Sequence, residues 1–117
     1  MKIYICADFS QDGIEMLKDT GHEVRTGGWG FTSKILDEDE LIAEIGDADV
    51  LFVGYEPVTR KVLEKTNLKV ISSIRGGPRA NIDVDAATEL GIPVFFTFGR
   101  EALPVADFTM GVLLGLA

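Results

Sequence analysis

Residues 68–109 read LKVISSIRGGPRANIDVDAATELGIPVFFTFGREALPVADFT, and this stretch decides the fold of the chain. A β-branched pair, Val70 and Ile71, leads into a glycine-rich turn at residues 75–79. A short segment with a capping residue, a second apolar run at residues 92–96 and another Gly-Arg turn follow. Two strands that each end in a Gly-Arg turn offer backbone N–H groups and positive charge to a small anion at one edge of a sheet.

The rest of the chain alternates apolar runs with segments that have helix-capping residues. Runs typical of strands occupy residues 2–7, 22–26, 49–54, 68–72 and 93–97. Helices are expected after Ser10, Asp37, Thr59 and Asp83, and from about Pro104 to the last residue. Strands that alternate with helices across short turns favour a parallel sheet with right-handed crossovers. We predict one domain, residues 1–117, with a flavodoxin-like α/β three-layer sandwich and a five-stranded parallel sheet in the order 2-1-3-4-5.

The composition excludes several classes of partner. The 11 basic and 19 acidic side chains give a net charge of −8, which opposes binding to nucleic acid or to an anionic membrane. The longest apolar stretch, residues 110–117, is too short to span a bilayer. Cys6 is the only cysteine, so no intrachain disulfide can form, and no signal peptide is expected before the first strand. These features predict a cytoplasmic protein with a buried, inert thiol.

Ligands of open parallel sheets bind beyond the carboxyl ends of the strands, and this rule selects four loops. They are residues 8–10, 54–57, 75–81 and 98–101. In the third loop, the N–H groups of Gly76 and Gly77 can converge on a carboxylate, whereas Pro78 has no N–H to donate. The same residues also fit an ordinary tight turn, and the residue types alone leave both interpretations open.

A series of short motifs follows the glycine-rich turn. They are Asn81-Ile82-Asp83, Ala86-Ala87, Gly91-Ile92-Pro93-Val94, Phe98-Gly99-Arg100-Glu101 and Val105-Ala106-Asp107-Phe108-Thr109. In this order they resemble the N-terminal, substrate-binding lobe of the D-isomer-specific 2-hydroxyacid dehydrogenases. The resemblance implies that this chain is the substrate-binding part of an NAD(P)-dependent oxidoreductase acting on the CH–OH group of a small D-2-hydroxy acid.

The resemblance also implies a site and a role for the C-terminal segment. The N–H groups of Gly76 and Gly77 would hold the carboxylate of a small-molecule substrate. The substrate-binding residues would further include Arg75, Asn81, Tyr55, Arg100 and Glu101. Residues from about 104 onward would be a truncated interdomain helix.

Two positions depart from the family pattern. Phe98 replaces the usual proline, and Glu101 replaces an asparagine that hydrogen-bonds the substrate in relatives such as formate dehydrogenases. A carboxylate at position 101 would repel an anionic acid unless it is protonated or paired with Arg100 or Arg75. It could instead select a substrate with an amine or with extra hydroxyl groups.

The chemistry of hydride transfer is not found in this sequence. The family binds its nicotinamide cofactor, NAD or NADP, through a G-x-G-x-x-G motif on a second lobe, and Gly27-Gly28-x-Gly30 lacks the third glycine. The one histidine, His22, is expected in a solvated turn near the wrong end of the sheet, and no residues have metal-ligand spacing. We therefore expect no catalytic, cofactor-binding or metal-binding residues here, no NAD(P) binding by this chain alone, and no activity of this chain alone.

Two other classes of function are compatible with the predicted topology. A non-enzymatic small-anion-binding or interaction module derived from the same lobe remains open. A phosphoacceptor domain needs an aspartate after strand three and a lysine after strand five, where this chain has Gly54 and Phe98. A flavodoxin needs a Ser/Thr-rich loop after strand one, where this chain has DFSQD at residues 8–12.

The C-terminal segment generates a prediction about self-association. Residues 104–117, PVADFTMGVLLGLA, have almost no polar face after Thr109. Because an apolar helix left in water forfeits about 1.5–3 kcal/mol for each large side chain, we expect two copies to form a homodimer through this segment. Replacing Leu113 and Leu114 with lysine should give a folded monomer in sedimentation experiments. A strictly monomeric unmodified chain at high micromolar concentration would contradict the prediction.

Overall fold

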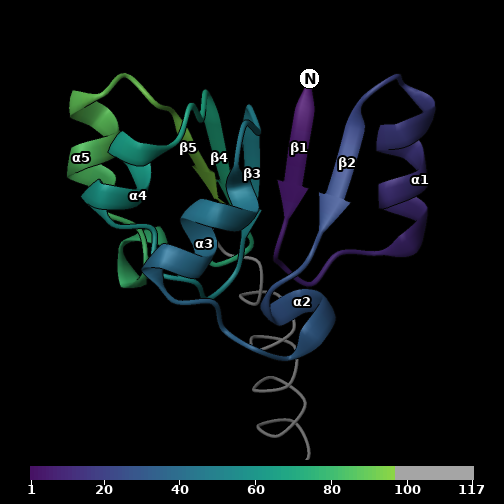
Figure 1. Ribbon diagram of the computed structural model, residues 1–117, viewed down its shortest axis with the longest axis horizontal. Coiled ribbons are helices and arrows are strands. Elements are labelled where there is room, and N and C mark those ends of the chain that lie inside the picture. The colour runs from purple at the N-terminus through teal and green to yellow at the C-terminus, as the bar shows by residue number, and fades with distance from the viewer. Residues whose placement is uncertain (97–117) are drawn as a thin grey trace, which may run out of the picture.

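A five-stranded, entirely parallel sheet forms the centre of the computed structural model, which describes residues 1–96 (Figure 1). The strands are β1 (Lys2–Ile5), β2 (Glu23–Thr26), β3 (Val50–Val53), β4 (Val70–Ser73) and β5 (Val94–Phe96). Their order is β2-β1-β3-β4-β5, which confirms the predicted topology. All strands point in one direction, so their carboxyl ends meet at one edge of the sheet.

Helices lie on both sides of this sheet. α1 (Gln11–Asp19) lies beside β2, and its Ile14 packs with Ile3 and Ile5. On the other side, α3 (Glu38–Ile45), α4 (Arg60–Lys65) and α5 (Val84–Glu89) cover β3, β4 and β5. Side chains alternate between the two faces of a strand, so the two faces of β3 can be buried to different extents.

A continuous apolar run such as that of β3 is typical of a strand that is covered on both faces. Leu51 and Val53 are fully buried against the side of α3–α5. Val50 and Phe52 face the side of α1 and are only partly buried by the described residues. Within residues 1–96, β3 is therefore fully covered on one face of the sheet and partly covered on the other.

The predicted capping residues begin the helices as expected. Asp37 and Glu40 form a reciprocal capping box at the start of α3. Elsewhere the cap side chains accept hydrogen bonds from the first turn: Ser10 from the N–H of Gly13 (3.1 Å), Thr59 from that of Val62 (3.4 Å) and Asp83 from that of Ala86 (3.0 Å). These local signals fix where the elements start, independently of the packing.

The segment around Trp29 differs from the prediction. The expected helices did not include one between residues 26 and 37, but Trp29–Thr32 form a short helix, α2, beyond the carboxyl ends of β1 and β2 (Figure 1). The close packing of this segment against β1 requires a residue without a side chain, because a Cβ on Gly30 would lie 2.0 Å from the carbonyl oxygen of Ala7. This contact is tertiary, which is why the local sequence did not indicate it.

Several predictions lie outside the described residues. They concern the second Gly-Arg turn with Phe98, Arg100 and Glu101, and the helix from about residue 104. Within residues 1–96, no helix is long and apolar enough to cross a membrane.

Asp49 joins the amino ends of three strands. Its Oδ2 accepts a hydrogen bond from the backbone N–H of Lys2 (2.9 Å), and its backbone oxygen accepts one from the N–H of Lys69 (2.7 Å). The Lys69 ammonium lies 3.4 Å from Oδ1. The Lys2 N–H, together with Lys69, lowers the pKa of the Asp49 carboxyl below its usual value.

Because this pKa is lower in the folded state, the ionised carboxyl stabilises the fold at neutral pH and the contribution is lost as the pH falls. We expect the free energy of unfolding of Asp49→Asn to decline less steeply than that of the unmodified protein between about pH 5 and about pH 2. Urea unfolding at a series of pH values measures both slopes. Parallel curves for the two proteins would contradict the assignment.

Candidate functional site

Two of the predicted ligand loops are joined to each other at the carboxyl edge of the sheet. Val58 forms a parallel bridge with Ile82. Its N–H donates to the carbonyl of Asn81 (2.8 Å), and its carbonyl accepts from the N–H of Asp83 (2.9 Å). The loop after β3 and the loop after β4 therefore form one connected layer.

The side chain of Asn81 strengthens this connection. Its Nδ2 donates to the carbonyl of Gly54 (2.9 Å) and to the carbonyl of Glu56 (2.8 Å). Its Oδ1 is buried and has no hydrogen-bond partner among the described residues. Asn81 was predicted to bind substrate, and the structure places its amide nitrogen against the neighbouring loop, where it braces the site.

Gly76 and Gly77 are exposed, and their N–H groups donate to no other residue within residues 1–96. The φ angle of Gly77 is −120°, which any residue can adopt, and a Cβ built there would meet nothing within 4 Å. Neither backbone conformation nor packing within the described residues requires a glycine at position 77. The absence of a side chain leaves the backbone open to a ligand.

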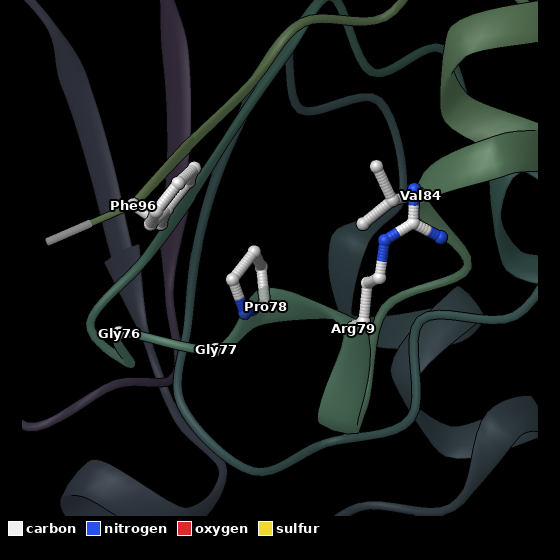
Figure 2. A pocket seen from close by; sticks show the side chains of 6 residues that line it. All are labelled: Gly76, Gly77, Pro78, Arg79, Val84 and Phe96. Atoms are coloured by element: carbon white, nitrogen blue, oxygen red, sulfur yellow. The ribbon is translucent and has the colours of Figure 1, made fainter. Parts of the chain in front are cut away.

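A pocket of about 420 Å³ lies beside this loop (Figure 2). Its lining consists of Gly76, Gly77, Pro78, Arg79, Val84 and Phe96. Figure 2 shows Phe96 and Arg79 on opposite sides of Pro78. Arg79 is ion-paired with Asp85 at 3.1 Å, so part of its charge is already compensated.

Two of the predicted site residues, Arg75 and Tyr55, are in contact. The guanidinium carbon of Arg75 lies over the Tyr55 ring, 5.2 Å from its centroid. The ring of Trp29 in α2 meets the same tyrosine edge-on, with centroids 5.7 Å apart and an interplanar angle of 88°. Sequence reasoning missed Trp29; its one available signal was a tryptophan within the glycine-rich segment at residues 27–30.

Glu56 is the second functional candidate that the sequence did not reveal. Its side chain is fully buried, and Oε1 accepts a hydrogen bond from the backbone N–H of Trp29 (2.7 Å). Oε2 has no partner among the described residues. Burial and, next, the nearby Glu56 raise the pKa of the Cys6 thiol, which agrees with the predicted inert cysteine. The only sequence signal was a charged residue two positions before the buried Val58.

His22 lies where it was predicted, at the opposite edge of the sheet. It precedes the amino end of β2, and its Nδ1 is 3.2 Å from the terminal amine of Met1. It therefore lies away from the loops that contain the candidate site.

Comparison with known proteins identifies the family. The family model described as "D-isomer specific 2-hydroxyacid dehydrogenase, catalytic domain" matches residues 3–111. The chain belongs to this family.

Similarity to individual dehydrogenases of the family is substantial. The chain is 41% identical to a D-3-phosphoglycerate dehydrogenase of Methanocaldococcus jannaschii, an alignment that covers 100% of this chain and 21% of that protein. It is 42% identical over 88 residues to a hydroxypyruvate reductase of Thermotoga maritima, covering 74% of this chain and 28% of the relative. It thus spans less than a third of the length of either relative.

A solved structure of the family shares the fold. The NAD+-bound 3-phosphoglycerate dehydrogenase of Entamoeba histolytica superposes with a TM-score of 0.71 at 26% identity, covering 97% of this chain and 38% of that one. The predicted resemblance to the D-isomer-specific 2-hydroxyacid dehydrogenases is confirmed, and so is the predicted fold.

The glycines of this dehydrogenase domain fall into two groups with opposite expected responses to alanine. Gly30→Ala should lower the free energy of unfolding by about 1–3 kcal/mol, because its Cβ would overlap the backbone of Ala7. Gly77→Ala should leave it unchanged or raise it by up to about 1 kcal/mol, since the conformation and the space both permit a Cβ. Urea unfolding of both variants tests this difference, and equal losses of stability would contradict it.

Proposed function

We propose that this domain is the substrate-binding part of an NAD(P)-dependent oxidoreductase that acts on the CH–OH group of a small D-2-hydroxy acid. The observation that carries the proposal is the pair of exposed residues Gly76 and Gly77, whose N–H groups donate to no described residue. Arg75 lies next to them in the chain, and no carboxylate of residues 1–96 is ion-paired with it. In a protein of net charge −8, this is a local site for an anion.

The chemical role of such a site is to anchor and orient the acid. The substrate carboxylate accepts charge-assisted hydrogen bonds from the N–H groups of Gly76 and Gly77. A carboxylate fixed in this way limits the directions in which the C2–H and C2–OH bonds can point. Orientation of the reacting carbon before hydride transfer is the contribution that this domain would make to the rate.

The described residues do not fit a dinucleotide cofactor. The glycines at positions 28 and 30 could suggest a phosphate-binding turn, but a Cβ on Gly28 would lie 2.7 Å from Cys6 Cβ and from Glu56 Oε1. Their backbone is thus packed against the protein interior. NAD or NADP would be bound by a part of a longer protein, as the short coverage of the relatives also suggests. We therefore infer no NAD(P) binding and no turnover by the 117-residue chain itself.

Two further parts of the proposal concern the setting of the domain. The lone, buried Cys6 and the acidic composition support a cytoplasmic protein. Pairing of two copies through residues 104–117 remains our proposal for its assembly.

A non-enzymatic anion-binding module would use the same loop at Gly76 and Gly77. The two functions are distinguished by whether a longer natural chain that contains this domain oxidises a 2-hydroxy acid.

Amide chemical shifts of the 117-residue chain test the proposal. We expect glycolate to shift the signals of Gly76 and Gly77 saturably, with a dissociation constant of about 1–100 mM, since exposed N–H groups and charges each contribute only about 0.3–1 kcal/mol. Glycolamide, which keeps the hydroxyl group but has no charge, is the matched control and should have a much weaker effect. NAD should cause no saturable shift.

Two outcomes would overturn the proposal. Equal shifts from glycolate and glycolamide would show that the carboxylate is not recognised at this loop. Turnover of NADH and a 2-keto acid by the homogeneous 117-residue chain would contradict the inferred division of function.

A further inference from the structure

One half of the sheet, on the side of α1, has no helix over it within residues 1–96. On this side α1 covers β1, and the ring of Phe9 meets that of Phe52 in β3 edge-on, with centroids 5.1 Å apart. β4 and β5 follow β3 in the sheet order and lie farther from α1 (Figure 1). Because α3, α4 and α5 lie on the opposite side, the cover that the described residues provide on the side of α1 ends at β3.

The uncovered surface is apolar and carries no charge. The register aligns Phe52, Ser72 and Phe95 in one row across three strands. Val70 pairs with Val50 two positions earlier. Since residues paired in register lie on the same face, both rows face the side of α1. Phe95 is 61% exposed, although a parallel sheet is normally covered on both faces. We call the part of this surface on β4 and β5, formed by Val70, Ser72 and Phe95, the open face.

Residues 104–117 have the length and the apolar pattern to cover the open face. As a helix they would extend about 21 Å, which exceeds the length of about 10–13 Å of strands with 3 or 4 residues. Four apolar side chains at helical spacing form one stripe along such a helix: Val105, Phe108, Val112 and Leu116. The segment lies outside the described residues, and its sequence alone carries this pattern.

The connection to this segment is long enough for it to return over the sheet. β5 ends at Phe96, and residues 97–103 lead from there to the segment. A connection of this length can span up to about 23 Å, which is enough to turn back over the edge of the sheet. The opposite side is already covered by α3, α4 and α5. A helix that follows β5 therefore meets open apolar sheet surface on the side of α1.

We propose that residues 104–117 fold back over β4 and β5 as a helix and cover the open face, so that the sheet has a helical layer on both sides. The apolar stripe packs on Val70 and Phe95. Leu113 and Leu114 lie outside the stripe and remain available for the proposed pairing of two copies. The inference does not depend on anion binding at the glycine-rich turn. It concerns the chain of 117 residues, since a longer protein could direct the same segment to another domain.

Contacts of the Phe95 ring test the proposal directly. We expect nuclear Overhauser effects between this ring and methyl groups of Val112 or Leu116 in the 117-residue chain. Phe96 is the internal control, because it is the next residue and its side chain lies on the opposite face, where it lines the pocket with Val84. Its ring should show no effect from the segment. Absence of contacts from the segment to Phe95 would overturn the proposal.

A mixture of isotope-labelled and unlabelled chains shows whether the contact lies within one chain. We expect the effects to Phe95 within the labelled chain and not between the two kinds of chain. Effects between chains alone would show that the segment is exchanged between two copies, which would overturn the fold-back.

Substitution of the same two phenylalanines gives a second test. Both side chains are exposed within the described residues, so neither aspartate variant removes core packing there. Phe95→Asp should accelerate hydrogen exchange of the amides of residues 108–117 by about tenfold or more, because a charge would then face the apolar stripe. Phe96→Asp, the matched control, should change it by less than about twofold, as expected for an exposed position away from the contact.

Two results of the exchange experiment would contradict the proposal. One is equal acceleration by the two substitutions. The other is exchange of residues 108–117 in the unmodified chain at the rate of an unfolded peptide. Amide spectra of residues 1–96 check that both variants keep the fold, and the contacts of the Phe95 ring in the unmodified chain decide the question if either variant does not.

Discussion

The hydrogen bonds between the loops after β3 and β4 are the interaction on which the candidate site depends. Gly76 and Gly77 donate to no described residue, and the internal hydrogen bonds of the loop begin with the short 3-10 turn at Pro78–Ala80, where the Gly77 carbonyl accepts from the N–H of Ala80 (3.1 Å). The end of the loop is held because Asn81 donates to Gly54 and Glu56 and accepts from the N–H of Val58. Because the N–H groups of Gly76 and Gly77 donate to no described residue, these contacts with the neighbouring loop supply part of the order of the turn.

The buried carboxylate of Glu56 shows what the arrangement costs. A carboxylate without a full set of donors is expensive to bury, and Oε2 has no partner among the described residues. In return, Oε1 fixes the start of α2, which carries Trp29 over the carboxyl edge. Unsatisfied buried polar groups are few in native proteins, and each calls for an explanation. For Glu56, the hydrogen bond to the backbone of Trp29 supplies a structural one.

The fold could be predicted from the sequence because its determinants are local. β-branched runs identified the strands, and Ser10, Asp37 and Asp83 marked the helix starts. Alternation of the two element types then left few topologies. The candidate site was predictable only in part. The loops that contain Arg75 and Tyr55 were expected at the same edge of the sheet, and there the two side chains are in contact. The hydrogen bond from the N–H of Trp29 to Glu56, by contrast, joins residues that are 27 positions apart. No local pattern encodes such a contact.

Glycine illustrates why a motif alone does not establish a ligand site. Gly30 has no side chain because the backbone of Ala7 occupies the space, whereas Gly77 has open space where its side chain would be. In the sequence both belong to glycine-rich turns near the ends of strands, and both could suggest phosphate or carboxylate binding. What a Cβ would meet separates them: a glycine that lies against protein atoms is required by packing, whereas a glycine with empty space around it, whose N–H donates to no described residue, leaves its backbone available to a ligand. By this criterion the turn at residues 75–79 is available to a substrate, and the glycine-rich segment at residues 27–30 is not.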